Sequence, residues 1–198
     1  MTNFLLDTNV ILYRGGSANG YNVDDFWNNT LPLEENDICV PREVEHELQV
    51  QYFQLEAQGK HDLVFLIRDR IIPSLDILDI PESTEAEQVV KLASSYLCTK
   101  YNIMKPVTSK NANPGRWWNE YPGISDARIL LTALYFDYDL VTFNIKDFML
   151  LLVMGKDVWN PIDNCKYPPI DSSIQAQINN DSRYLNYKRI IEDFINSY

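Results

Sequence analysis

Short apolar runs alternate along the chain with longer segments in which apolar residues recur every three or four positions. The short runs predict buried strands at 4–6, 37–40, 75–80 and 140–142. Helical spacing, clearest for Val44, Leu48, Tyr52 and Leu55 after Pro41, predicts amphipathic helices. Further helices are expected to begin near Val10 and Ser125 and to cover about 61–71, 84–101 and 182–195. Strands that alternate with helices predict an α/β fold, a three-layer α/β/α sandwich around a central, mainly parallel sheet.

The same pattern suggests how the chain is divided. Its 198 residues, 45% of them hydrophobic, are enough for one sizeable core. The stretch 105–123 is rich in Pro, Gly, Asn and Ser and has no clean period, so it is expected to be a long loop. We therefore predict one domain over 1–155 with a helical and loop elaboration inserted at about 60–123. Residues 156–198 are expected to form a C-terminal extension packed on the same domain.

Charge and cysteine content limit the classes of function. The net charge of −11 argues against indiscriminate binding to nucleic acid, because phosphate backbones attract basic proteins. The negative charge is compatible with a nucleic-acid substrate if some of the acids hold divalent cations, since bound Mg²⁺ or Mn²⁺ reverses the local electric field. The three cysteines have no zinc spacing, and no apolar run is long enough to cross a membrane. These features favour a cytoplasmic protein with reduced thiols.

Three acidic residues stand where open α/β sheets place their sites. Asp7 follows the first apolar run, Asp147 lies shortly after the run 140–142, and Asp126 opens a helix. Ligands of such sheets bind beyond the carboxyl ends of the strands. Each acid also has an ordinary structural interpretation. Asp7 could cap a helix, Asp126 could complement a helix dipole, and Asp147 could be a surface turn residue.

A fourth acid, Glu47, lies in the acidic run Glu43, Glu45 and Glu47. Such runs are usually solvated helix faces. Glu47 adjoins the apolar line through Val44 and Leu48, so we expect it to be the most inward of the three. None of the four acids identifies a site by itself.

Four segments in chain order carry a more specific signal. Leu5–Leu12 joins an apolar strand to Asp-Thr-Asn and an apolar helix, and Val40–Leu48 presents a glutamate just before a leucine on a helix led by proline. Ser125–Leu134 opens an Ala-containing helix with an aspartate, and Leu140–Phe148 ends a strand in Thr, followed by Asn and Asp-Phe. In this order the segments resemble the motifs of PIN-domain nucleases. Within that family they are most similar to the motifs of VapC-type toxins from toxin–antitoxin pairs.

This resemblance implies a PIN-like fold and divalent-metal-dependent hydrolysis of RNA, with Mg²⁺ or Mn²⁺ as cofactor and 5′-phosphate and 3′-hydroxyl products. It makes Asp7, Glu47, Asp126 and Asp147 the catalytic and metal-binding residues. Asn144 stands where the family often has Asp, which leaves Asp147 as the fourth acid. Hydrogen bonds that hold the carboxylates are expected from Asn9, Thr142 and Asn144. The resemblance also brings an antitoxin-like protein inhibitor and a homodimer into consideration, although the chain is longer than a minimal toxin.

The long loop offers candidate contacts to nucleic acid. Lys105, Lys110 and Arg116 precede Trp117 and Trp118 in a stretch without acidic residues. Basic side chains next to aromatic rings suit single-stranded RNA, whose bases stack on the rings. In the alternative interpretation the tryptophans pack on the domain and the lysines are simply solvated.

Other classes of function are also considered. A haloacid-dehalogenase-type phosphatase needs a second acid two residues after the first, where this chain has Asn9. His46 and His61 do not form the ligand pair of a zinc hydrolase. A catalytically inactive PIN-like domain that binds RNA or a protein partner is the main alternative to the nuclease.

Overall fold

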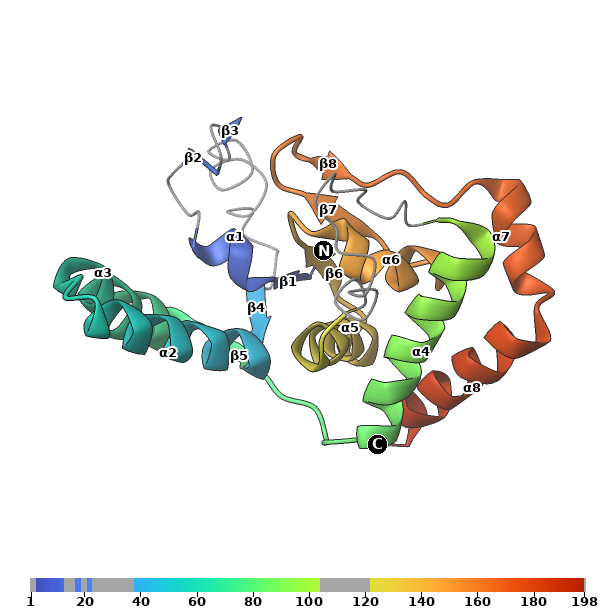
Figure 1. Cartoon of the computed structure of the whole chain (residues 1–198), viewed down its shortest axis with the longest axis horizontal. Helices are drawn as coiled ribbons and strands as arrows, with labels where there is room; N and C mark the ends of the chain where they lie inside the picture. The colour runs from blue at the N-terminus through green and yellow to red at the C-terminus, as the bar shows by residue number, and fades with distance from the viewer. Residues whose placement is uncertain (1–2, 13–16, 19–20, 23–37, 104–121, 198) are drawn as a thin grey trace, which may run out of the picture.

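A six-stranded sheet forms the centre of the part of the chain that the computed structural model describes, residues 3–12, 17–18, 21–22, 38–103 and 122–197 (Figure 1). The strand order is β5 (Ile77–Leu78), β4 (Ile38–Pro41), β1 (Phe4–Leu6), β6 (Asp139–Val141), β7 (Val158–Asn160) and β8 (Cys165–Lys166). Neighbouring strands pair in parallel except β7 and β8, which are antiparallel. A separate antiparallel pair joins β2 (Ser17–Ala18) to β3 (Tyr21–Asn22). The predicted α/β class with a mainly parallel sheet is confirmed.

Helices connect the parallel strands, as a parallel sheet requires. Their bounds are α1 (Thr8–Leu12), α2 (Arg42–Ala57), α3 (His61–Phe65), α4 (Thr84–Tyr101), α5 (Ile124–Phe136), α6 (Ile145–Val153), α7 (Ser172–Asn179) and α8 (Ser182–Asn196). Helix α5 packs on β4 and β6, α6 packs on β7, and α2 contacts β4 and β5. Helix α4 lies over α5 and α6, and α8 packs on α4 from the outside. No described helix is long and apolar enough to cross a membrane.

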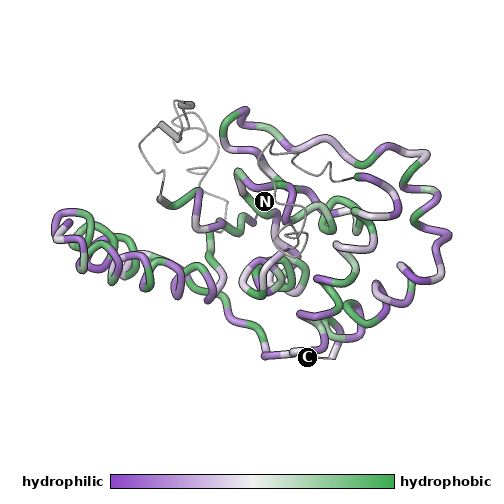
Figure 2. The backbone as a smooth tube through the Cα atoms, viewed as in Figure 1, coloured by the Kyte–Doolittle hydropathy of each residue, from purple (hydrophilic) through white to green (hydrophobic). Residues whose placement is uncertain are grey.

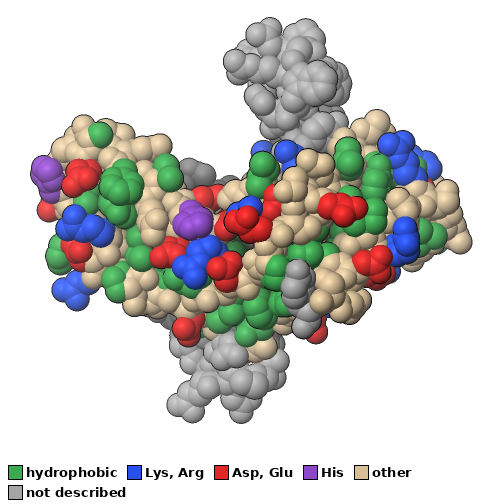
Figure 3. All heavy atoms as spheres, turned by 90° about the horizontal axis from the view of Figure 1, so that it is seen from below, with side chains coloured by type: hydrophobic (Ala, Val, Ile, Leu, Met, Phe, Trp, Pro, Cys, Tyr) green, Lys and Arg blue, Asp and Glu red, His purple; other side chains and the backbone are tan. Residues whose placement is uncertain are grey.

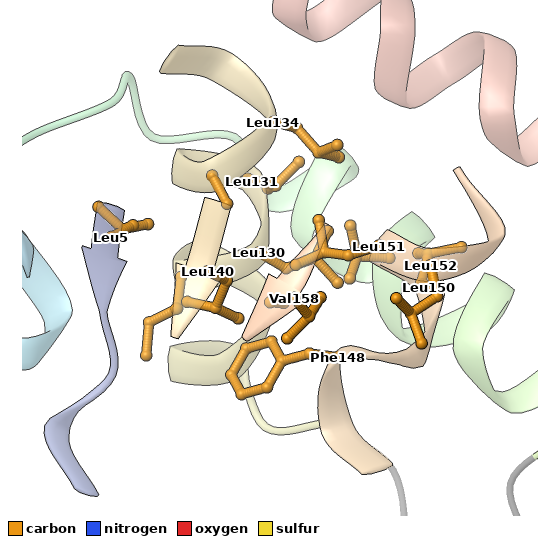
Figure 4. Packing of buried hydrophobic residues seen from close by; sticks show 14 of the residues in the cluster. Leu5, Leu130, Leu131, Leu134, Leu140, Phe148, Leu150, Leu151, Leu152 and Val158 are labelled. Carbon is orange, nitrogen blue, oxygen red and sulfur yellow. The ribbon is translucent and has the colours of Figure 1, made fainter. Parts of the chain in front are cut away.

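The central strands are unbroken apolar runs in the sequence because they lie in the hydrophobic core. Phe4, Leu5 and Leu6 are at most 3% exposed because both faces of β1 are covered. Figure 2 shows hydrophobic residues concentrated on the strands and on the helix faces turned toward them. In Figure 4, leucines of α5 and α6 surround Leu140 and Val158 on the neighbouring strands. This packing gives the carboxyl ends of β1 and β6 a rigid support.

A helical arm, defined here as α2, α3 and the π-helical turn 66–71 that follows, extends away from the sheet (Figure 1). The helix expected at 61–71 is therefore observed as one α-helical turn and one π-helical segment. The arm reverses direction at Gly59, whose φ of 71° lies in the left-handed region that favours glycine. The arm carries several exposed large apolar side chains, namely Val50, Phe53, Leu63, Phe65 and Leu66.

The C-terminal segment takes part in the sheet as well as covering the domain. Strand β7 pairs with β6, so residues after 155 extend the central sheet. Helix α8 is attached to α4 through Asp181, which is 8% exposed and caps α8 by accepting from the Arg183 and Tyr184 amides. Burial opposes ionisation, but hydrogen bonds from Lys100, Tyr101 and Tyr96 hold the pKa of Asp181 well below its usual range. Asp181 thus joins the last helix to the domain.

Candidate functional site

Asp7 lies at the carboxyl end of the central strand and is only 6% exposed. Its amide donates to the Val141 carbonyl at 3.1 Å, which continues the β1–β6 pairing and brings Asp7 beside Thr142. The Thr142 hydroxyl donates to Asp7 Oδ2 at 2.6 Å, and the Asn9 side-chain amide donates to the same oxygen at 2.5 Å. Asp7 is therefore held in one orientation by a residue of α1 and by the residue that follows β6.

The turn after β6 is tied into the same network. The Thr142 hydroxyl accepts from the Asn144 amide at 2.9 Å, and Asn9 Oδ1 accepts from the Phe143 amide at 3.2 Å. The side-chain amide of Asn144 donates to Asp147, which lies in the first turn of α6. The polar residues named from the sequence, Asn9, Thr142 and Asn144, thus bond the carboxylates of Asp7 and Asp147 directly.

Glu47 reaches the site from α2, on the other side of β1. One of its carboxylate oxygens accepts from the Thr8 hydroxyl and the other accepts from the Ser125 hydroxyl. Thr8 belongs to α1 and Ser125 to α5, so three helices meet at this carboxylate. Neither hydroxyl was expected from the sequence to bond a carboxylate of the site. The signal was present, because each directly adjoins one of the candidate aspartates.

Asp126 enters from the first turn of α5. A helix is expected from the sequence to begin near Ser125, with the Ser125 hydroxyl able to cap it. That capping role is wrong, because α5 begins at Ile124 with Gly123 in the cap position. Asp126 Oδ2 instead accepts from the Gly123 amide at 2.7 Å. A Cβ at position 123 would lie 3.2 Å from this oxygen, so glycine leaves room for the carboxylate. Asp126 thus also fills the structural role of bonding the helix N-terminus.

The four acids influence one another electrostatically. Burial raises the pKa of Asp7 to about 6, with further increases from Glu47 and Asp126 and an opposing effect of the Thr142 hydrogen bond. Burial also raises the pKa of Asp126, and Asp147 and Glu47 raise it further, whereas Lys146 lowers it. Asp7 and Asp126 therefore share one electrostatic environment, although they lie 119 positions apart along the chain. Mutual repulsion of this kind is relieved by a cation.

The donor set fits a hard divalent cation by chemistry, since carboxylate, hydroxyl and amide oxygens are the ligands that Mg²⁺ and Mn²⁺ prefer. Within the described residues, no three His, Cys, Asp or Glu side chains are arranged closely enough to hold a metal ion. The carboxylates of Asp7, Glu47 and Asp147 are instead bonded by neutral hydroxyls and amides. Closing these side chains around an ion therefore requires some of them to rotate.

The structure corrects one expectation about the acidic run on α2. Glu43 rather than Glu47 is the most inward of the three, with 8% exposure. The reason is Arg128 on α5, whose guanidinium lies 2.7 Å from Glu43 Oε1 and 2.7 Å from Glu87 Oε1. This cluster lines a cavity of about 360 Å³. Figure 3 shows acidic and basic side chains gathered near the middle of one face of the molecule. A neutralising arginine permits burial that the sequence pattern did not reveal.

The candidate nucleic-acid contacts are the remaining part of the sequence prediction. Lys105, Lys110, Arg116, Trp117 and Trp118 lie outside the described residues. They stay predictions. The helix α5 that follows them places Asp126 at the site described above.

Comparison with known proteins gives matches at the level of structure. No family model matches the sequence, and no curated protein matches it. The crystal structure of FitAcB from Neisseria gonorrhoeae is similar with a TM-score of 0.51 and 21% identity, over 80% of this chain and 97% of that chain. The structure of FitAB bound to an IR36 DNA fragment has a TM-score of 0.51 and 20% sequence identity, over 80% of this chain and 94% of that chain. The structure of VapBC2 from Rickettsia felis bound to a promoter DNA fragment has a TM-score of 0.45 and 22% sequence identity, over 74% of this chain and 91% of that chain.

At this identity the FitAB similarity shows the fold alone. It agrees with the PIN-like fold that the four sequence motifs imply, and nearly the whole of the FitAB chain is matched.

Proposed function

We propose that this chain is a divalent-metal-dependent nuclease that hydrolyses RNA, with its active site at Asp7, Glu47, Asp126 and Asp147. The observation that carries the proposal is the hydrogen-bond network at the carboxyl ends of β1 and β6. It ties Asp7 to Asp147 through Thr142 and Asn144, and it bonds Glu47 to the residues next to Asp7 and Asp126. Among the described residues, none of the four forms an ion pair with a lysine or arginine. Carboxylates kept together without a paired cation are costly unless a metal ion is to be bound.

In this proposal Asp7 and Asp126 are direct ligands of Mg²⁺ or Mn²⁺, Glu47 binds metal or orients the attacking water, and Asp147 completes the site. A bound divalent cation would activate water and neutralise the charge that develops on the phosphate. The residues around it fix the ligands. Asn9 and Thr142 hold Asp7, and Thr8 and Ser125 hold Glu47, so the rotation that would bring the carboxylates to an ion starts from defined orientations.

A direct assay tests this proposal. Wild-type protein and Asp7→Asn would be incubated with defined single-stranded RNA and with DNA of the same sequence, in Mg²⁺, in Mn²⁺ and in EDTA. We expect metal-dependent RNA cleavage that leaves 5′-phosphates and 3′-hydroxyls, and a loss of at least about a thousandfold in the variant. Glu56→Gln, an exposed site on the same helix as Glu47, is the control and should cleave normally.

Two results would contradict the nuclease. Cleavage that persists in EDTA or in Asp7→Asn would place the chemistry elsewhere. RNA binding without any cleavage in either metal would favour the inactive binding domain.

We further propose that the chain works as a toxin whose site is covered by an antitoxin-like protein inhibitor. The four sequence motifs resemble those of VapC-type toxins, and structures of FitAB proteins, one of them bound to a DNA fragment, have a similar fold. Expression of the wild-type chain alone should then arrest growth, and Asp7→Asn should not. Equal growth of cells that express either form would contradict the toxin role without bearing on cleavage in vitro.

A further inference from the structure

An apolar groove begins at the candidate active site and runs outward along α2. One face of this helix, formed by Glu47, Val50, Gln51 and Gln54, makes one wall, and Ile124 at the start of α5 lies opposite. These four positions span two turns, which is about 10 Å of helix. The groove encloses about 450 Å³, within the range of sites for small organic ligands. Its inner end is Glu47 itself.

The lining combines exposed apolar surface with unused amide groups. Val50 is 55% exposed and Ile124 is 56% exposed, so both offer apolar surface to a ligand. Within the described part of the chain, the side-chain amides of Gln51 and Gln54 have no hydrogen-bond partner. Each amide offers both donors and an acceptor to a ligand.

The groove offers little to hold a phosphate group away from the proposed metal site. Glu43, Glu47 and His46 contribute to its lining, Glu43 is already paired with Arg128, and no lysine or arginine is found among the described residues that line it. A flat, uncharged group with apolar faces and polar edges suits both the apolar walls and the free amides.

We propose that this groove is a nucleobase subsite, which binds the base of the nucleotide next to the scissile phosphate. The inference deepens the proposed nuclease function, because the occupant is part of the same substrate. The base would lie between Val50 and Ile124, and Gln51 and Gln54 would bond its polar edge. Continuity with Glu47 favours the substrate over a separate protein partner, since an occupant of the groove touches a residue of the proposed active site. Cleavage therefore depends on a base at one position of the strand.

Base removal from the substrate gives a sharp test of this dependence. A single abasic nucleotide would be moved along a single-stranded RNA, and wild-type cleavage would be measured at each position. We expect a loss of about tenfold or more when the abasic site adjoins the cleaved bond, because the base no longer buries apolar surface against Val50 and Ile124. In the double variant Val50→Ser with Ile124→Ser, the intact RNA should be cleaved as slowly as the abasic RNA. Cleavage of the abasic RNA should be the same in both proteins.

Matched controls separate the groove from general surface effects. Leu92→Ser and Gln88→Ala change exposed residues on α4, away from the groove, and should keep the full dependence on the base. If the groove variant slows intact and abasic RNA equally, or slows neither, the subsite is refuted. Gln51→Ala with Gln54→Ala should alter the preference among the four bases more than the rate for the best one.

A binding measurement decides the matter even if the protein cleaves nothing. The side-chain amide signals of Gln51 and Gln54 would be followed by NMR while a single-stranded trinucleotide is added. Shifts that disappear when the trinucleotide is abasic support the subsite, whether or not cleavage occurs. The absence of shifts refutes it, whether or not the nuclease is active, and leaves the groove to a polypeptide partner.

Discussion

Two acidic clusters lie side by side between α2 and α5, and they treat their carboxylates in opposite ways. Glu43 and Glu47 are one turn apart on α2, and Arg128 and Ser125 are one turn apart on α5. Glu43 and Glu87 share the guanidinium of Arg128, with two contacts of 2.7 Å. Glu47 is bonded only by the hydroxyls of Thr8 and Ser125 among the contacts that the structure describes.

The contrast distinguishes a carboxylate used for structure from one available for chemistry. Arg128 supplies a full positive charge and bonds both glutamates, so the first cluster needs no ligand. Neutral hydroxyls orient Glu47 but do not compensate its charge, and the buried Asp7 nearby has a pKa raised to about 6. The second cluster remains electrostatically incomplete. That difference, rather than the number of acids, marks the candidate active site.

The largest expected effect comes from breaking the first cluster. Arg128→Met should lower the free energy of unfolding by about 3–5 kcal/mol, because Glu43 and Glu87 would be left buried without a cation. Thermal denaturation of the variant and of wild type would measure this loss. Arg189→Met, at an exposed position on α8, should change stability little. Adding Glu43→Gln and Glu87→Gln to Arg128→Met should restore much of the loss, and a failure to do so would assign the effect to packing instead.

In the second cluster, by contrast, removing a charge is expected to raise the free energy of unfolding. The pKa of Asp7 is raised from 3.8 to about 6 in the folded protein, so the folded state binds the proton more tightly than the unfolded chain. Stability contributed by Asp7 is therefore full below about pH 4 and is lost as the pH rises through about 6. Asp7→Asn should raise the metal-free unfolding free energy at pH 7.5 by up to about 3 kcal/mol.

The pH dependence checks that interpretation. The advantage of Asp7→Asn, measured by metal-free denaturation, should shrink as the pH is lowered and vanish near pH 4. Mg²⁺ or Mn²⁺ should narrow it at pH 7.5, because a bound cation stabilises only the wild type. A variant that is less stable than wild type at every pH would make Asp7 a structural helix cap.

The smallest effect should come from the hydroxyls that hold Glu47. Ser125→Ala and Thr8→Val should each weaken Mn²⁺ affinity about tenfold, because Glu47 loses one of its two orienting bonds. Isothermal titration with Mn²⁺ measures this, and Ser125→Thr should keep the affinity by keeping a hydroxyl. Thr99→Val, which removes a hydroxyl that bonds the Ser95 carbonyl, is the control. Unchanged Mn²⁺ affinity in both site variants would show that Glu47 needs no such positioning.

Local patterns were sufficient for much of the fold. The expected helix at 84–101 matches α4, and the apolar runs 4–6 and 140–142 correspond to β1 and β6. Strand β7 escaped notice because Val158, Trp159 and Asn160 are too few to show a period. The apolar residues at 66–71 predict an ordinary α-helix, because one π-helical turn is too short to change the spacing expected of an α-helix.

The sequence by itself determined the central strands and several of the helices, and which of them end or begin at an acid. Asp7 after an apolar run and Asp126 at a helix start are local features, so they could be read without a structure. Only the tertiary structure decided which acid meets a cation. Glu43 and Glu47 look alike on α2, and the register of α5 against that helix gives one of them an arginine and the other a serine. Such a distinction depends on contacts between residues 78 or 85 positions apart, and no local pattern carries it.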